Sequence, residues 1–432
     1  MEIFVKVCYN GYSIKTEAFM DENKLLKTHL IFDSYEKRFL RSRIDKPHYI
    51  PTGESERQKI IEKVKTMLGY DENLIPQIEN LTEVSEADLG AFSVKHLRYT
   101  TWKDTYASAS LYLPKARRKL PLALLACGHG AGGRLYKKYR AMARRLAATG
   151  IAVIVPDNIG QGDREFMGHK DCVGPFFAGL TLQGLIVMET VALIRHMAKD
   201  ERFDTSRFAA LGNSGGGTLT MMLAALAPEL SVIASSGYPS EFHYIFSKER
   251  GHCSCNLLPG CVALDMWEIY SVFAPKPLLL ESGIHDKYFP IEYFERNARR
   301  VAGVYTLKGA GESFEKVATD TRHGWEDEDY FVISEFLKRR LGAAETESSE
   351  SVKSEEDNRD VYHVSFPDGA LTTDALAEML CGKKMPAGTA LEDIFKPTFC
   401  GEEIRESEII SDLGRGRVMK AFAQMECALK QK

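Results

Sequence analysis

The feature that most constrains the fold is a regular alternation of short apolar runs and helix-length segments between Leu120 and Leu341. This alternation is typical of a mainly parallel sheet covered by helices on both faces, because each strand is then buried on two sides. The runs predicted to be strands are LPLALLACG, IAVIVPD, RFAALGNS, LSVIASSG, KPLLLESG and GVYTLKG, the last giving a strand at Val304–Lys308. The segments predicted to be helices are Tyr136–Thr149, Thr181–Lys199, Gly215–Ala227, Pro290–Val301 and Glu326–Leu341.

Composition shifts divide the chain into four predicted parts. The first part, 1–90, is an extension packed on the main domain, with a strand at Ile3–Cys8 and helices near Asp21–Arg43 and Glu54–Leu68. The main domain, 91–342, opens with a β-hairpin that turns near Trp102. Residues 343–360 are rich in Ser and Glu and predict a flexible acidic linker. The last part, 361–432, is a small segment of unknown function with a strand at 361–366 and helices at Thr372–Leu380 and Arg417–Lys430.

Charge and hydropathy exclude several function classes. The chain has 56 Lys and Arg against 60 Asp and Glu, a net charge of −4, so it lacks the basic surplus of a nucleic-acid-binding protein. No apolar run reaches the ~20 residues that span a bilayer, so no membrane association is expected. The N-terminus does not resemble an export signal, and nine scattered cysteines in a large chain favour free thiols. We therefore expect a cytoplasmic protein; its oligomeric state stays open.

Gly212-Asn213-Ser214-Gly215-Gly216 lies between a predicted strand and a predicted helix. Gly-x-Ser-x-Gly in this setting is the nucleophile elbow, a sharp turn that exposes the serine hydroxyl. Its glycines avoid clashes, and the amide of Gly215 is placed to stabilise a developing oxyanion. An ordinary glycine-rich turn or a phosphate-binding turn is the alternative for this motif alone.

The partners of a nucleophilic serine follow it in the order acid and then histidine. Asp286 comes shortly after the run PLLLESG, and His323 precedes the last predicted helix of the main domain, Glu326–Leu341. We therefore predict Ser214 as nucleophile, His323 as base and Asp286 as the carboxylate that orients the imidazole. His285 is a rival candidate for the base, but it follows the run PLLLESG, and the residue expected after that strand is the acid.

The loop Gly128-His129-Gly130-Ala131-Gly132-Gly133 directly follows the first of these strands. A second oxyanion amide is needed from this loop, and small residues let the backbone approach a substrate. We assign this amide to Ala131, with Gly130 as the neighbouring choice. The spacing does not fit a dinucleotide-binding fingerprint, so no cofactor is expected.

With these motifs in place, the chain resembles the acetyl-xylan-esterase-like branch of the α/β-hydrolases, which is related to dienelactone hydrolases and to the catalytic domains of prolyl oligopeptidases. The segments that carry the resemblance are HGAGG, PDNIGQGDRE, GNSGGG, HCSCNLLPG, APKPLLLESGIHDKYFP and RHGW, within roughly residues 50–341. The resemblance implies an α/β-hydrolase fold and serine carboxylesterase chemistry, and it leaves the substrate class loosely defined.

Two further groups of residues were weighed as sites. His252, Cys253 and Cys255, with Cys261 nearby, offer soft ligands for zinc, but their spacing is too tight for a structural zinc site. We interpret the segment as a packed loop near the active-site mouth and expect no metal. The second group follows the strand IAVIVPD and either shapes the substrate pocket or stabilises its loop; it consists of Asp157, Asp163 and Arg164.

The leading hypothesis is a serine carboxylesterase that hydrolyses a short-acyl ester, such as an acetylated carbohydrate, through an acyl-enzyme. Its expected partner is a small-molecule or saccharide ester. One alternative is a serine peptidase of the prolyl-oligopeptidase type. Such peptidases usually carry a large β-propeller before the hydrolase domain, whereas here only about 100 residues precede it and they are predicted to be partly helical. The other is a non-catalytic binding protein on a hydrolase fold, for which a broken triad would be the signature.

Overall fold

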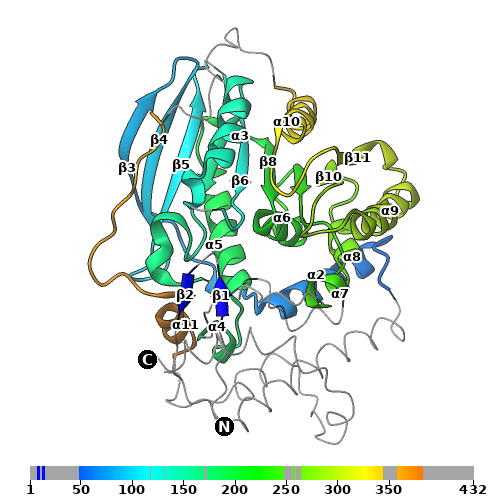
Figure 1. Cartoon of the computed structure of the whole chain (residues 1–432), viewed down its shortest axis with the longest axis horizontal. Coiled ribbons are helices and arrows are strands. Elements are labelled where there is room, and N and C mark those ends of the chain that lie inside the picture. Colours follow the sequence, from blue (N-terminus) through cyan, green and yellow to red (C-terminus); the bar gives the residue numbers. More distant parts are fainter. Residues whose placement is uncertain are drawn as a thin grey trace, which may run out of the picture.

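The computed structural model describes residues 7–9, 12–14, 48–116, 118–130, 132–169, 172, 174–247, 255, 258, 264–343 and 358–382. Within them, nine strands form one sheet in the order β11-β10-β9-β8-β6-β7-β5-β4-β3 (Figure 1). The strands of this sheet are β3 (Glu79–Asp88), β4 (Phe92–Thr100), β5 (Tyr106–Pro114), β6 (Leu120–Ala126), β7 (Ala152–Pro156), β8 (Phe203–Asn213), β9 (Val232–Ser236), β10 (Leu278–Gly283) and β11 (Phe314–Thr319). From β7 to β11 all neighbours are parallel, whereas β3, β4 and β5 pair antiparallel with one another and β5 with β7.

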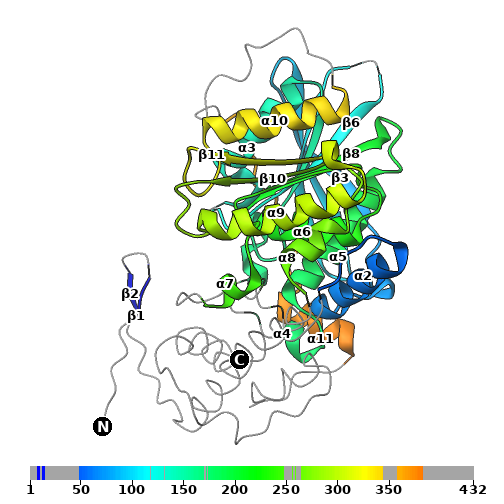
Figure 2. The ribbon, with the colours of Figure 1, turned by 90° about the vertical axis from the view of Figure 1, so that its right-hand side faces the viewer.

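Helices cover both faces of this sheet, as the sequence predicts. Figure 2 shows the sheet nearly edge-on, with α3 and α10 on one side and α6, α8 and α9 on the other. The helices are α2 (Glu54–Leu68), α3 (Lys137–Ala148), α4 (Gly174–Phe177), α5 (Leu182–Met197), α6 (Gly215–Leu226), α7 (Phe242–Ser247), α8 (Met266–Ser271), α9 (Ile291–Leu307), α10 (Asp327–Leu341) and α11 (Thr373–Cys381). The predicted α/β-hydrolase architecture is therefore confirmed.

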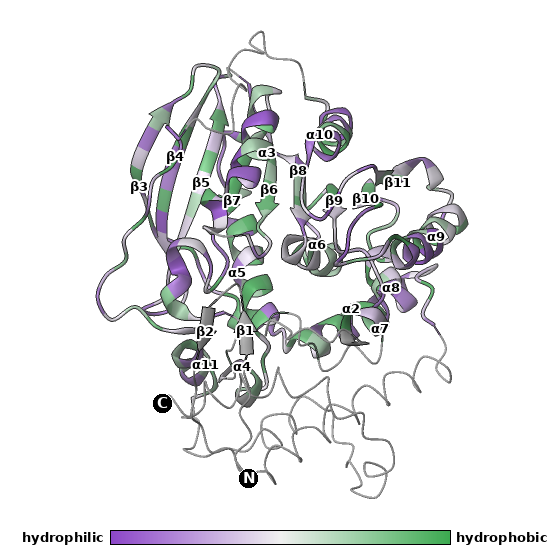
Figure 3. Ribbon diagram, viewed as in Figure 1, coloured by the Kyte–Doolittle hydropathy of each residue, from purple (hydrophilic) through white to green (hydrophobic). Residues whose placement is uncertain are grey.

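The central strand β6 explains why the apolar runs are continuous rather than alternating. Every residue of β6 is buried, and Figure 3 shows it as predominantly hydrophobic. Successive side chains point to opposite faces of a strand. Leu122 and Leu124 accordingly join the core on the α5–α6 side, while Ala123 and Leu125 join the core beneath α3 and α10.

The predicted strand at Val304–Lys308 is wrong, because these residues lie at the C-terminal end of α9 and just beyond it. The apolar positions Phe294, Ala298, Val301 and Val304 recur at helical spacing and are buried on one side of α9. A short β-branched run therefore reads as a strand in isolation, but it continues the helical period that precedes it. The strand that precedes α10 is β11, which lies further along the chain.

At the N-terminal side, α2 has the predicted bounds and packs against α6 and α8. The strand β3 was missed, because its side chains are mostly exposed and its sequence lacks apolar alternation. Since β3 pairs with β4, the sheet begins before the predicted boundary at residue 90. Two short strands, β1 (Val7–Tyr9) and β2 (Tyr12–Ile14), pair with each other. The predicted helix at 21–43, and the predicted strand at 3–8 apart from residues 7 and 8, lie outside the described residues.

Residues 358–382, which comprise the end of the predicted linker and the start of the C-terminal segment, lie along the hydrolase. Asp360, at the end of the predicted flexible linker, is buried, and its carboxylate forms ion pairs with Arg140 and Arg144 of α3. The Tyr112 hydroxyl donates to the same carboxylate at 2.9 Å. Residue 360 is therefore part of the folded body, although residues 344–357 of the predicted linker lie outside the described residues.

Residues 361–366 form no strand, contrary to prediction, whereas the predicted helix near 372–380 is present as α11. Figure 1 shows α11 beside α4, and the Gly174 N–H donates to the Asp374 carboxylate at 2.8 Å. The predicted helix at 417–430 lies outside the described residues. No helix in the described part of the chain is long and apolar enough to cross a membrane.

Candidate active site

The serine turn between β8 and α6 has the strained geometry of an elbow. Ser214 has φ 59° and ψ −119°, a conformation that L-residues rarely adopt. Side chains at the flanking glycines would collide with backbone: a Cβ on Gly212 would lie 2.4 Å from the Gly216 carbonyl, and one on Gly216 would lie 2.0 Å from the Ala126 carbonyl. Packing around the turn therefore requires the glycines of the Gly-x-Ser-x-Gly pattern.

The predicted acid and base meet across two loops. His323, after β11, shares a hydrogen bond of 2.7 Å between its Nδ1 and Oδ2 of Asp286, after β10. The other carboxylate oxygen of Asp286 accepts the N–H groups of Tyr288 and Phe289 at 2.7 and 3.0 Å. These bonds hold the buried carboxylate in place, and they direct the Nδ1 proton of His323 towards it. The Nε2 atom is thereby left as the site for a transferred proton.

The rival base, His285, has a different partner. Its Nε2 lies 2.7 Å from Asp320, and both side chains are largely exposed. His285 therefore belongs to a surface pair, whereas the imidazole of His323 is paired with a buried carboxylate.

A buried hydrogen-bond network joins the serine turn to the histidine loop. The backbone carbonyl of Ser236, at the end of β9, accepts the Ser214 N–H at 3.1 Å. The hydroxyl of Ser236 accepts from the indole N–H of Trp325 at 2.9 Å and from the Asn213 amide at 3.0 Å, and it donates to Glu281 at 2.5 Å. Ser236 therefore fixes the turn that carries Ser214 relative to the loop that carries His323.

Ser214 and His323 thus lie on segments tied to one residue, but within the described residues they share no hydrogen bond with each other. Catalytic hydrogen bonds are often long in the resting state and shorten when substrate binds. The aromatic rings of Tyr288 and Phe289 lie 4.8 and 5.5 Å from the His323 ring, so they form part of its surroundings.

Glu281 was missed by the sequence analysis. It is buried on β10, and it accepts from Ser236 and from Thr319 at 3.0 Å. Burial, together with the nearby Asp329 carboxylate, raises the pKa of Glu281 to about 8. The signal in the sequence was an acid inside the apolar run PLLLESG, where an unpaired charge is costly and a protonated, hydrogen-bonded carboxyl is favoured.

The predicted oxyanion residues are placed only in part. Gly215 is the first residue of α6, so its N–H has no partner within the helix. The other predicted residue, Ala131, lies outside the described residues. Its loop is held by Tyr139, whose hydroxyl accepts the Gly128 N–H at 2.8 Å, and a Cβ on Gly128 would lie 3.1 Å from the Ser214 Cβ. The loop that contains Gly130 therefore begins against the serine turn.

The acidic loop after β7 supports structure in its described contacts. Asp157 accepts from the Arg134 backbone at 2.7 Å, and its carboxylate pairs with the Arg134 side chain at 3.1 Å. Asp163 pairs with the same guanidinium, and Arg164 forms a two-pronged ion pair with Glu189. Of the two readings left open for this group, these contacts support loop stabilisation.

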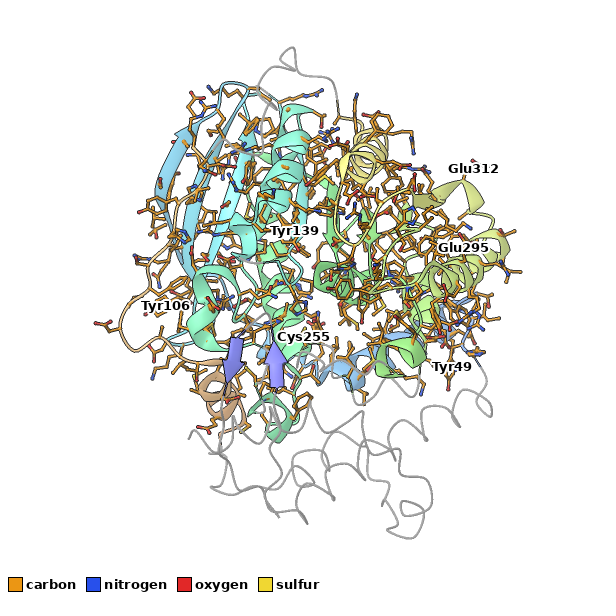
Figure 4. The ribbon with its side chains drawn as sticks, viewed as in Figure 1. Tyr49, Tyr106, Tyr139, Cys255, Glu295 and Glu312 are labelled. Atoms are coloured by element: carbon orange, nitrogen blue, oxygen red, sulfur yellow. The ribbon has the colours of Figure 1, made fainter. Side chains whose placement is uncertain are left out.

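Of the cysteine segment, only Cys255 is described among the residues weighed as ligands. Its side chain is buried (Figure 4). The other three, His252, Cys253 and Cys261, lie outside the described residues.

The chain is similar in sequence to a known protein family. Residues 73–252 match the family model for acetyl xylan esterase (AXE1). The resemblance to acetyl-xylan-esterase-like α/β-hydrolases is confirmed. The matched range contains Gly130 and Ser214 but ends before Asp286 and His323, so the acid and base rest on the geometry above. This family match supports the prediction that the chain is a carboxylic ester hydrolase.

A curated relative, named "Putative hydrolase YtaP" from Bacillus subtilis (strain 168), is 23% identical over 192 residues; the aligned part spans 44% of this chain and 64% of that relative. Among solved structures, "Methylesterase BT1017" superposes with a TM-score of 0.59 at 18% identity, covering 87% of this chain and 83% of that one. A glucuronoyl esterase from Solibacter usitatus superposes with a TM-score of 0.51 at 14% identity, covering 66% and 92%. At these identities the structural likeness shows the α/β-hydrolase fold.

Proposed function

We propose that this protein is a serine carboxylesterase that hydrolyses a short-acyl ester of a carbohydrate through an acyl-enzyme. The observation that carries the proposal is the 2.7 Å pairing of His323 with the buried Asp286, on a loop tied through Ser236 to the strained turn of Ser214. The same fold hosts many reactions, so the residues of the site, rather than the fold, indicate the chemistry.

In the proposed reaction, the Ser214 hydroxyl attacks the ester carbonyl while Nε2 of His323 takes its proton. Asp286 stabilises the imidazolium that forms. The negative charge on the carbonyl oxygen is met by the N–H of Gly215 and by a second amide from the Ala131 loop. When the intermediate collapses, His323 returns the proton to the leaving alcohol, and water then releases the acid by the same steps in reverse.

The proposal also names the substrate class, an ester of a carbohydrate. It is supported by the acetyl xylan esterase match, and the methylesterase and glucuronoyl esterase share the fold. Four of the described cysteines, Cys127, Cys172, Cys255 and Cys381, form no disulfide. Thiols are typical of reducing compartments, and we therefore include a cytoplasmic location in the proposal.

The test is the variant Ser214→Ala. We expect hydrolysis of an activated acetate ester to fall by about 10³-fold or more with the fold unchanged. A fluorophosphonate probe should label Ser214 in the wild-type protein. A folded variant with near-native turnover, or labelling at another serine, would refute the nucleophile. A panel of acetylated sugars, methyl esters and aminoacyl substrates then separates the esterase from a peptidase.

A further inference from the structure

Beside the serine turn, three side chains from distant parts of the chain converge. Nε2 of His129, on the loop after β6, lies 3.2 Å from Nε2 of His169 and 3.2 Å from Sγ of Cys255. All three ligand atoms lie within 4.8 Å of one another. We propose that His129, His169 and Cys255 bind a divalent transition-metal ion of the zinc type.

The donor set and its spacing suit such an ion. Zinc binds imidazole nitrogen at about 2.0–2.1 Å and thiolate sulfur at about 2.3 Å, so neighbouring ligand atoms in a tetrahedral site are about 3.3–3.6 Å apart. The two 3.2 Å separations are close to this range. Three protein ligands leave one position open, which is the pattern of reactive rather than purely structural zinc sites.

The second ring nitrogen of His169 provides independent support. Its Nδ1 lies 2.6 Å from the backbone carbonyl of Ile159, and a carbonyl only accepts, so Nδ1 carries the proton. In the neutral ring Nε2 then carries the lone pair, and it lies 3.2 Å from Nε2 of His129 and 3.4 Å from the side-chain nitrogen of Gln161. Metal-binding histidines are commonly held by this kind of bond from the other nitrogen to a carbonyl.

A hydrogen-bond network alone accounts less well for the cluster. A proton on Nε2 of His129 points to one neighbour at a time, yet both His169 and Cys255 approach that one atom equally closely. A cation among the three ligand atoms would accept all three lone pairs. Because His129 is exposed while Cys255 is buried, an ion can enter from the side of His129.

The site would lie next to the proposed nucleophile. A Cβ on Gly215 would come within 2.9 Å of Cε1 and Nδ1 of His129, so the imidazole packs against the residue that follows Ser214. In the sequence, the other candidate ligands near Cys255 are its chain neighbours His252, Cys253 and Cys261. The fold instead places it with two histidines that are 126 and 86 positions earlier in the chain.

The test is titration of the full-length, metal-free protein with Co²⁺, a spectroscopic substitute for zinc. We expect one equivalent to bind with a thiolate-to-cobalt charge-transfer band and tetrahedral visible bands. Cys255→Ala should abolish the charge-transfer band, and His169→Gln should weaken binding by about tenfold or more. Cys172→Ala is the matched control, because Cys172 is another buried thiol close in sequence to His169 and should leave the band intact.

Thermal melting of each variant without metal shows whether it is folded. If Cys255→Ala fails to fold, His169→Gln and His129→Gln carry the same test, since neither histidine is buried. The proposal is refuted if the wild-type protein shows no thiolate band, if Cys255→Ala keeps the band, or if folded His variants bind Co²⁺ as tightly as the wild type. None of these readouts depends on esterase activity.

Discussion

Two buried carboxyl groups, Glu281 at the candidate active site and Asp360 under the C-terminal segment, have opposite ionisation. Glu281 receives hydroxyl hydrogen bonds, and burial raises its pKa to about 8, so it is protonated at neutral pH. Burial also acts to raise the pKa of Asp360, but hydrogen bonds and charge from Arg144 and Arg140 outweigh it and hold that pKa below its usual range.

The difference shows that burial keeps an interior acid neutral unless cationic partners outweigh it, as Arg140 and Arg144 do at Asp360. The hydrogen-bonded network around Glu281 sets the geometry of the loops that carry Ser214 and His323. The ionic cluster around Asp360 attaches the chain after the main domain to α3. We therefore expect variants in the first region to act on catalysis and variants in the second to act on stability.

The largest expected effect is on catalysis. His323→Ala should lower turnover of an activated acetate ester by about 10³-fold or more, and adding Ser214→Ala should cause little further loss, because the two groups act as a unit. The measurement is the turnover of the activated ester by the two single variants and the double variant, together with the melting temperature of each. Multiplicative losses in the double variant would contradict a shared mechanism.

On the other side of the comparison, Asp360→Ala should destabilise the protein by about 3–5 kcal/mol, because it leaves Arg140 and Arg144 buried without their carboxylate. Turnover of the folded variant should stay near that of the wild type. Urea unfolding measures the loss, and Asp368→Ala, an exposed acid in the same segment, is the control. If Asp360→Ala and Asp368→Ala were equally stable, the ion pairs of Asp360 would not be what holds residues 358–382 against α3.

A smaller effect is expected in the pH dependence of folding stability, which distinguishes Glu281 from Asp360. The folded-state pKa of Glu281 is raised from 4.5 to about 8, so its contribution to stability is present at low pH and is lost as the pH rises through that range. Glu281→Gln resembles the protonated form and should lack this loss, so its stability relative to the wild type should increase from pH 5 to pH 9. Unfolding curves at both pH values test this, with the exposed Glu292→Gln as control. The same pH trend in both variants would refute a protonated Glu281.

The smallest effect is expected at His285. Because its pair with Asp320 is exposed, His285→Ala should change neither ester turnover nor stability appreciably. Steady-state kinetics alongside His323→Ala decide between the two histidines. A severe loss of turnover in His285→Ala, with activity kept in His323→Ala, would reverse the assignment of the base.

Local sequence patterns were sufficient to predict the alternation of strands and helices, the turn that carries Ser214, and the order in which Asp286 and His323 follow it. These features are local: each depends on the period of the apolar side chains and on the backbone freedom of glycine. Local patterns also caused two errors. The short apolar run Val304–Lys308 fits either a strand or the end of a helix, and it was predicted to be a strand. The strand β3 was missed because its side chains are mostly exposed and show no alternation of apolar and polar residues.

Contacts between side chains that are distant in the sequence become visible in the folded chain. Ser236 and Trp325 are 89 positions apart, and Asp360 lies 216 positions from Arg144, yet both pairs are in contact. Whether Glu281 is neutral and Asp360 ionised, and whether Cys255 faces histidines or merely packs, depends on these contacts. The physical reason is that hydrogen bonds, ion pairs and metal coordination act over a few ångströms in space, and the folded sheet sets those distances independently of separation along the chain.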